Sequence, residues 1–154
     1  MAALSNTFQN KFLDFLLRAQ PFGFAGTTAA AGTGPANVYV ALFTAAPTAA
    51  GGGTEVSGNG YARVAVASSL TAWAGTQAAA STAASTGTSG LTSNNATVTF
   101  GTPLASWGQV VDVALMDSAT GGLMLAYGGL QTNMTVNTGT APTFAPAALS
   151  FSIS

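Results

Sequence analysis

The residues of this chain that could carry out acid–base or nucleophilic chemistry are few and widely scattered. The sequence has no histidine and no cysteine, which removes the usual general base, the thiol nucleophile and the ligands of most zinc sites. Its four carboxylates are Asp14, Glu55, Asp112 and Asp117. A glycosidase needs two carboxylates that face one another in a cleft, whereas these fall in an expected helix, a glycine-rich loop, an apolar strand and a turn. We therefore expect no enzyme, no cofactor and no metal centre.

The glycine run Gly51–Gly53, followed by Thr54, has the composition of a phosphate-binding loop but not its pattern. The Walker pattern requires a lysine beside the serine or threonine, and the only lysine of this chain is Lys11. A calcium site in the same loop would need more acidic oxygen ligands than Glu55 alone supplies. The glycines therefore predict turns rather than a ligand site.

Four charged residues have specific structural expectations. Glu55 and Arg63 flank a short loop, so we expect them to form an ion pair that holds this loop or a subunit contact, with a small-ligand site as the alternative. Asp112 lies within the apolar run Val110–Met116, where we expect an edge position or a hydrogen bond at an interface. Asp117 is expected to be a turn residue.

Trp73 and Trp107 each lie near the end of an expected strand, beside small residues. Packing in the core or at a subunit interface is the expected role of both indoles. The alternative is a carbohydrate-binding surface, in which these rings and the loop at Tyr61 would stack on sugars.

The charge content is the strongest compositional signal. Three basic and four acidic residues make up 5% of the chain, with a net charge of −1, against about 25% in an ordinary soluble domain. Such a surface suits a subunit that neighbours cover, and we expect a homo-oligomer within a larger assembly. Three basic residues provide no electrostatic footprint for nucleic acid or an anionic membrane. No apolar run approaches the roughly 20 residues of a membrane span, and we expect no secretion signal.

One amphipathic helix is predicted over Ser5–Gln20. Its first residue is a suitable N-cap, and Pro21 ends the pattern. Asp14 lies three and four residues from Lys11 and Arg18, within reach of both. The helix is expected either to lie on its own sheet or to be an arm, residues 1–22, that docks on a neighbour. Its apolar stripe consists of Leu4, Phe8, Phe12, Phe15, Leu16 and Ala19.

After residue 26 the spacing of apolar residues changes from that of a helix to every second residue, which is typical of strands. Both faces of Asn37–Phe43 are apolar, which indicates a central or doubly covered strand. A hairpin loop is expected at Asp117–Gly122, with Gly121 or Gly122 at positive φ. Short strands separated by turn residues predict a mainly β fold, an antiparallel β-sandwich over residues 23–154, with a jelly-roll as one version. The candidate strands are Asn37–Phe43, Tyr61–Ser68, a weaker piece at Leu70–Trp73, Ala96–Phe100, Val110–Met116, Leu123–Leu130, Thr132–Val136 and Leu149–Ser154.

Two segments have the composition of loops. Thr44–Gly60 is built from turn residues, and Gln77–Asn95 lies in a low-complexity stretch at about residues 75–95 that is rich in Ala, Ser and Thr. Such segments bury too little surface to offset the entropy of ordering them. We therefore expect them to become ordered by packing against partner subunits.

Several motifs resemble a family of small virion structural proteins of tailed bacteriophages, often labelled tail or tail-fibre proteins. The resemblance implies a virion component, assembled in the host cytoplasm, with no enzymatic activity. The loop Thr44–Arg63 is its most specific part. The motifs that carry it are Val38–Thr48, Gly51–Arg63, Ala96–Phe100, Trp107–Gly108, Val113–Gly122, Leu125–Gly128 and Leu149–Ile153.

The low charge and the single amphipathic arm favour a capsid decoration, or cement, protein that bridges subunits of the major capsid protein. The alternative is a tail component: a tube, an adaptor, or a fibre protein that could bind host glycans. In either case contact with other virion subunits would be the function, through buried area rather than chemistry. The candidate interface residues are Phe8, Phe12, Phe15, Leu16, Glu55, Arg63, Trp73 and Trp107.

Overall fold

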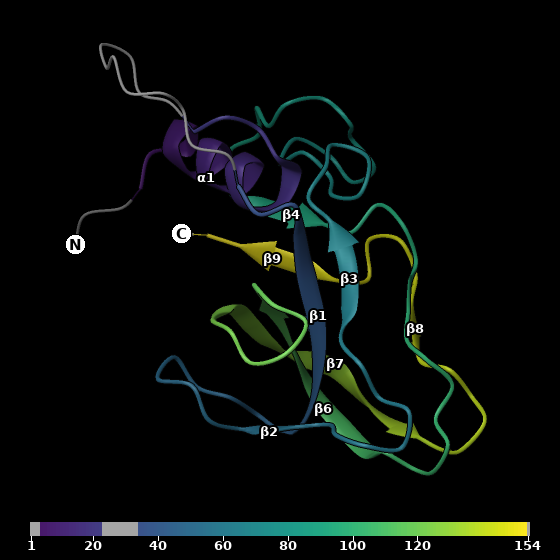
Figure 1. Ribbon diagram of the computed structural model, residues 1–154. Coiled ribbons are helices and arrows are strands. Elements are labelled where there is room, and N and C mark those ends of the chain that lie inside the picture. The colour runs from purple at the N-terminus through teal and green to yellow at the C-terminus, as the bar shows by residue number, and fades with distance from the viewer. Residues whose placement is uncertain (1–3, 23–33, 154) are drawn as a thin grey trace. The chain divides into compact units, whose positions relative to one another are not determined.

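The computed structural model describes residues 4–22 and 34–153, which form one helix and nine strands (Figure 1). Contacts within the chain group these residues into two compact units. The helix unit comprises residues 4–22, 34–37, 67–97 and 144–153, and the sheet unit comprises residues 38–66 and 98–143. The division into an N-terminal arm and one β-sandwich domain stays a prediction.

The prediction of a mainly β chain with antiparallel strands and one N-terminal helix is confirmed. The helix α1 spans Asn6–Arg18. No helix among residues 4–22 and 34–153 has the length and apolar character that crossing a membrane requires.

Both ends of α1 are closed by local hydrogen bonds. Ser5 is the N-cap, as predicted, and its Oγ accepts a hydrogen bond from the Phe8 N–H at 3.3 Å. At the other end Ala19 takes the left-handed conformation, with φ 54°, and the Gln20 N–H donates to the Asp14 carbonyl at 3.0 Å. Pro21 follows this cap, so the helix ends two residues earlier than the pattern predicts.

The helix unit contains a small antiparallel sheet, in which β4 (Leu91–Ser93) pairs with β9 (Ser150–Ser152). The expected alternation of the last run is present, because the serines of β9 are exposed while Leu149 is buried and Phe151 half-buried. The expected strand at Leu70–Trp73 is wrong. This segment is a turn, and only Trp73 forms an isolated bridge, with Asn94.

The sheet unit is built on a five-stranded sheet with the order β2-β1-β6-β7, in which β3 also pairs with β1. Its register runs from Tyr39 opposite Met116 to Phe43 opposite Asp112 in the central pair β1–β6. The strands of this sheet are β1 (Asn37–Ala45), β2 (Thr54–Glu55), β3 (Val64–Ala67), β6 (Gly108–Met116) and β7 (Met124–Val136), and a separate pair joins β5 (Val98–Thr99) to β8 (Thr143–Phe144).

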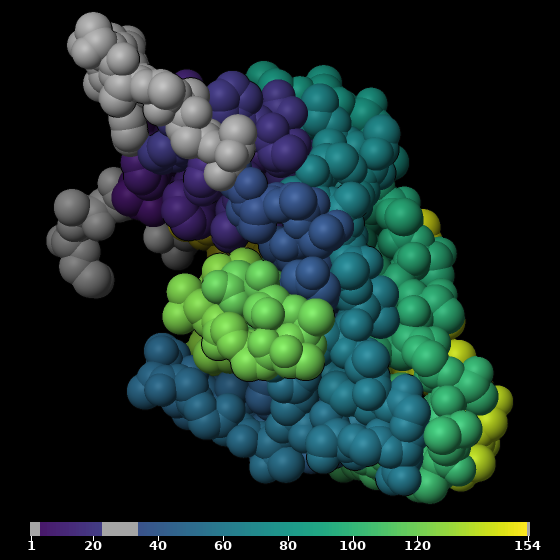
Figure 2. Space-filling view, in the orientation of Figure 1, coloured from purple at the N-terminus to yellow at the C-terminus, as the bar shows by residue number. Residues whose placement is uncertain are grey.

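The hairpin between β6 and β7 forms as predicted. Asp117 is its turn residue, since Asp117 Oδ1 accepts a hydrogen bond from the Leu123 N–H at 2.7 Å. Gly121 and Gly122 both have positive φ, at 59° and 77°. Figure 2 shows this hairpin loop (light green) and the glycine-rich loop (blue) on one visible face of the sheet unit.

β7 is one long strand where the sequence predicts two. Its register with β6 jumps, because Val110 is opposite Met134 whereas Asp112 is opposite Gly129. Residues 130–133 therefore form a bulge. The polar residues of this bulge interrupt the apolar alternation, which is why the sequence pattern breaks there.

The sheet is covered on both faces along β1, as its apolar pattern predicts. One face contributes the main core of the unit, and the other carries a cluster of Ala41, Phe43, Ala114 and Met116, with Tyr39 and Met124 packed against it. The residues of the first face are Val38, Val40, Leu42, Val113 and Leu115.

The expected edge position of Asp112 is wrong. β6 lies between β1 and β7, and Asp112 is only 5% exposed. Its Oδ1 has no hydrogen-bond partner among the described residues. Burial raises the pKa of the Asp112 carboxyl, and the backbone N–H groups of Gly128 and Val113 offset this only in part. The sheet thus carries one poorly solvated carboxylate in its interior.

Substitution of Asp112 by Asn should stabilise the chain at neutral pH. Because the pKa of Asp112 is raised on folding, the folded chain binds more protons than the unfolded chain, so this carboxyl lowers stability as the pH rises through its folded pKa. We expect Asp112→Asn to raise Tm at pH 7 by about 2 °C and to leave Tm nearly unchanged where the carboxyl is protonated. Thermal unfolding from pH 3 to pH 8 measures this, and a lower Tm for the variant at pH 7 would contradict the assignment.

Candidate association surfaces

α1 buries polar residues together with Leu13 and Leu17. Most of the apolar stripe is not buried, because Phe8, Phe15 and Leu16 are only half-buried and Phe12 is 37% exposed. The side chains that are buried on α1 belong to Gln9, Asn10, Leu13, Asp14, Leu17 and Arg18. An amphipathic helix usually places its apolar side inward, so the polar contacts of this helix must be strong enough to determine its orientation.

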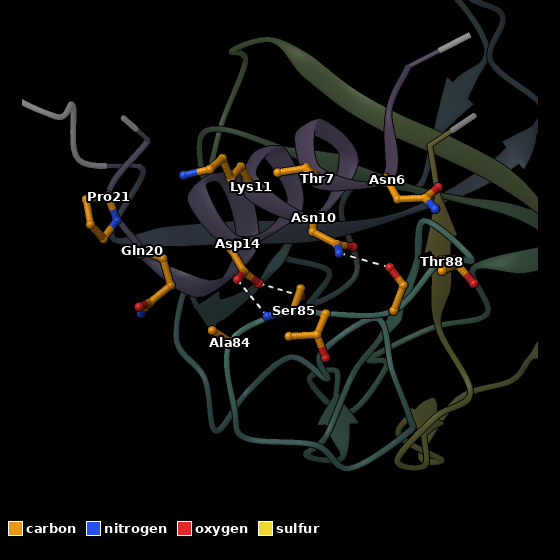
Figure 3. Close-up of a pocket in the computed structure, with 12 residues that line it drawn as sticks. Asn6, Thr7, Asn10, Lys11, Asp14, Gln20, Pro21, Ala84, Ser85 and Thr88 are labelled. Carbon is orange, nitrogen blue, oxygen red and sulfur yellow. Dashed lines mark hydrogen bonds between the residues drawn. The ribbon is translucent and has the colours of Figure 1, made fainter. Parts of the chain in front are cut away.

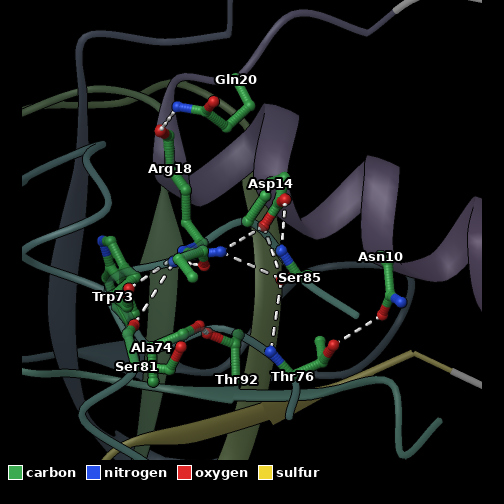
Figure 4. Close-up of polar contacts among 12 residues, drawn as sticks. Asn10, Asp14, Arg18, Gln20, Trp73, Ala74, Thr76, Ser81, Ser85 and Thr92 are labelled. Carbon is green, nitrogen blue, oxygen red and sulfur yellow. Dashed lines mark hydrogen bonds and ion pairs between the residues drawn. The ribbon is translucent and has the colours of Figure 1, made fainter. Parts of the chain in front are cut away.

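A buried ion pair between Arg18 and Asp14 is the centre of these contacts (Figure 4). Arg18 is fully buried, and its Nη1 lies 2.6 Å from Asp14 Oδ1. Its Nε donates to the Trp73 carbonyl at 3.0 Å, and its Nη2 donates to the Ala83 carbonyl at 2.6 Å. The Ser85 N–H donates to Asp14 Oδ2 at 2.8 Å. Each nitrogen of the guanidinium and both carboxylate oxygens therefore have a partner, as buried charges require.

A second polar contact lies one turn earlier on the helix. Thr76 Oγ1 donates to Asn10 Oδ1 at 2.7 Å, and Asn10 Nδ2 donates to the Gly87 carbonyl at 2.9 Å. The Gly87 N–H closes this set by donating to Thr76 Oγ1 at 3.0 Å. The segment rich in Ala, Ser and Thr is thus held by the helix of its own chain, through polar groups, where the sequence led us to expect a partner subunit.

The aromatic face of α1, consisting of Phe8, Phe12, Phe15 and Phe22, lies on the side that the polar contacts leave outward. The Phe22 ring centroid lies 5.7 Å from that of Phe8 and 5.6 Å from that of Phe15, and the Phe8 and Phe12 rings stack at 6.5 Å. Phe22 was not predicted to belong to this group, because the chain reaches it only by turning back after Pro21. The structure therefore brings three of the candidate interface residues together and adds a fourth ring.

An open cavity of about 510 Å³ lies between α1 and residues 84–88 (Figure 3). Its lining combines hydroxyl and amide side chains with Lys11, Asp14 and the small or apolar residues Pro21, Ala84 and Gly87. The Asp14 carboxylate in this lining is already engaged by Ser85 and Arg18, so it is poorly placed to act as a free base. No group of three His, Cys, Asp or Glu side chains that could hold a metal ion occurs among residues 4–22 and 34–153.

The predicted pair of Glu55 and Arg63 is present in the sheet unit. Arg63 Nε and Nη2 donate to the two oxygens of Glu55, at 2.8 and 2.7 Å. Arg63 Nη1 also donates to the carbonyls of Ser118 and Gly121, at 2.8 and 2.6 Å. This bidentate pair ties the glycine-rich loop to the β6–β7 hairpin loop, and its role as a subunit contact stays a prediction.

Tyr61 completes this cluster. Its hydroxyl donates to Glu55 Oε1 and accepts from the Leu42 N–H, both at 3.0 Å. Burial raises the pKa of the Tyr61 phenol. Burial alone would also raise the pKa of Glu55, but the hydrogen bonds from Arg63 and Tyr61 outweigh it and hold that pKa below its ordinary value. The pair therefore stays ionised at neutral pH.

The two tryptophans lie in the cores of different units. Trp73 is fully buried, and its ring meets Phe151 edge to face at 5.8 Å. Trp107 is buried against Tyr61 at 5.3 Å, and its Nε1 donates to the Asn59 carbonyl at 3.1 Å. Both indoles therefore pack in the core of their own unit, which is one of the two expected roles. Neither buried ring leaves a face open on which a sugar could stack.

Comparison with known proteins gives one family. The family described as Podophage GP4 fiber I protein gp80 matches residues 3–152, which is nearly the whole chain. No curated protein matches the sequence.

Removal of the Arg18 side chain should break the contacts between α1 and residues 76–87. Replacing Arg18 with Met leaves the Asp14 charge buried without its partner, so we expect a loss of about 3–5 kcal/mol in the free energy of unfolding. Urea denaturation measures this loss, and amide hydrogen exchange should show reduced protection at Ser85 and Gly87.

Lys11→Met is the matched control, because it removes one positive charge from an exposed position of the same helix. Its effect should stay within about 0.5 kcal/mol. Equal stability of the two variants would show that the buried pair does not determine how the helix packs.

Proposed function

The chain belongs to the podophage GP4 fiber I protein family, and from this premise we propose that it is a non-enzymatic subunit of a phage fibre that attaches to neighbouring virion proteins through the aromatic face of α1. As a member of this family it is a structural component of the virion and associates with other virion components. The attachment surface is the part that the geometry of α1 supports.

A fibre subunit is favoured over a capsid cement protein. Low charge and an amphipathic arm led to the cement hypothesis, but both features follow from being covered by neighbours in any assembly. The family description names a fibre and covers almost the whole chain. Tail and fibre proteins are therefore the partners that we propose, in place of the major capsid protein.

The orientation of α1 is the observation that supports attachment through its aromatic face. Asp14 and Arg18 are paired on the inner side, so they cannot turn outward without exposing or breaking a buried ion pair. Phe12 then presents more than a third of its surface to solvent, with half-buried rings on either side. Full burial of an exposed phenyl ring contributes about 1.5–3 kcal/mol, and each ring of this face can still contribute the fraction that corresponds to its exposed surface.

Phe12→Asp should abolish incorporation of the protein into particles while leaving the chain folded. The charge would be placed in the proposed contact, and the position is solvent-exposed in the free chain, so folding should tolerate it. We expect at least about a tenfold loss in copies per particle, which corresponds to about 1.4 kcal/mol of binding. Quantitative mass spectrometry of purified particles, produced by a phage that lacks its own copy of the gene, measures this loss.

Two variants control for folding and for charge. Thr7→Asp adds the same charge at an exposed position of α1 outside the aromatic face and should be incorporated normally. Phe12→Leu keeps an apolar side chain and should be incorporated nearly as well as the wild type. Normal incorporation of a folded Phe12→Asp variant would rule out attachment through this face.

A further inference from the structure

The outer edge of β7 is the longest open strand edge in the described sheet. β7 is the last strand in the order β2-β1-β6-β7 and pairs only with β6. Among the described residues, positions 124–135 have no backbone or side-chain hydrogen bond outside the β6–β7 pair. A row of unpaired N–H and C=O groups along a strand edge is a template for pairing with another strand.

This edge lacks the charges and prolines that usually protect such edges. Residues 118–154 contain no charged residue, and β7 contains no proline. Natural edge strands are commonly blocked by lysine, by proline or by a bulge. Here two register shifts against β6 interrupt β7, one at Leu125 and one at residues 130–133. The segment Ala126–Gly129 between them pairs with β6 in unbroken register and remains available for pairing.

The side chains beside this segment are apolar and accessible. Tyr127 is 42% exposed and lies opposite Ala114, on the same face as Met116 and Met124. An open groove of about 500 Å³, lined in part by Met116, Leu123 and Met124, begins at the start of the strand. A strand added to this edge would place its own side chains against these residues.

We propose that Ala126–Gly129 pairs in antiparallel fashion with the same segment of a second copy of this chain. An antiparallel edge is complementary to itself under a two-fold axis, so two identical segments can satisfy one another. Because neither edge carries charge, two copies do not repel each other, and a charged partner strand gains nothing from binding there. A two-fold pair uses the β7 edge of both copies, so this edge is filled in both and the pairing closes as a dimer.

This inference goes beyond the proposed function, since it concerns contact between copies rather than attachment to the virion. It is measured on the purified chain without particles, whereas the Phe12→Asp experiment is read on particles. A failure of the pairing proposal can therefore be distinguished from a failure of the proposed attachment to the virion.

Tyr127→Lys tests the pairing. We expect the wild-type chain to be a dimer in sedimentation equilibrium, and the variant to dissociate with a Kd raised on the order of tenfold or more, because two lysines would meet near the two-fold axis. Leu104→Lys is the matched control, since Leu104 is 76% exposed in the same unit and lies outside β7. The control should dimerise as the wild type does.

A charge-reversal experiment separates loss of pairing from loss of folding. Tyr127→Glu should also dissociate, and a mixture of the Lys and Glu variants should restore dimers, because opposite charges then meet. Amides of residues 126–129 should exchange more slowly in the dimer than in the dissociated variants. A monomeric or trimeric wild-type chain, or a dimer that Tyr127→Lys leaves unchanged, would overturn the proposal.

Discussion

The buried ion pair between Asp14 and Arg18 is the interaction on which the arrangement of the helix unit depends. A charge inside a protein is costly unless it is paired and hydrogen-bonded. Here the guanidinium meets a carboxylate of its own helix and the carbonyls of Trp73 and Ala83, and Ser85 satisfies the carboxylate. Rotating the helix to bury its phenylalanines would expose or unpair these groups. The aromatic face is thus outward because the polar face is engaged.

The placement of the few charged residues explains why the surface is nearly neutral. Four of the seven charged residues form two internal ion pairs, and Asp112 is buried in the sheet. Lys11 and Asp117 lie at exposed positions, and Asp117 Oδ1 accepts a hydrogen bond within its hairpin loop. The accessible surface is consequently almost neutral, and it includes apolar side chains on α1 and along β7. A neutral surface of this kind suits a protein that acts by contact with other subunits.

Local sequence patterns predicted the elements that depend on local chemistry. The Ser5 cap, the Asp117–Gly122 hairpin loop, the alternation at Leu149–Ser152 and the Glu55–Arg63 pair all follow from residues close in the chain. The residues close in the chain do not determine which side of α1 is buried. Asn10, Asp14 and Arg18 recur every four residues and form a polar stripe with the period of the apolar one. Apart from the pair that Asp14 and Arg18 form with each other, their partners lie more than fifty residues away, at Trp73 and in the low-complexity segment. The interior position of Asp112 depends on strand order, which the sequence pattern does not contain.

The central proposal for this fibre subunit is attachment to its neighbours through the outward face of α1. Photo-crosslinking from that face inside the particle tests it most directly, with benzoylphenylalanine placed at Phe12, where an aromatic side chain is already partly exposed. Irradiation of purified particles should join this position to another tail or fibre protein, identified by mass spectrometry. A crosslink to the major capsid protein, or crosslinks only within the chain itself, would contradict the account.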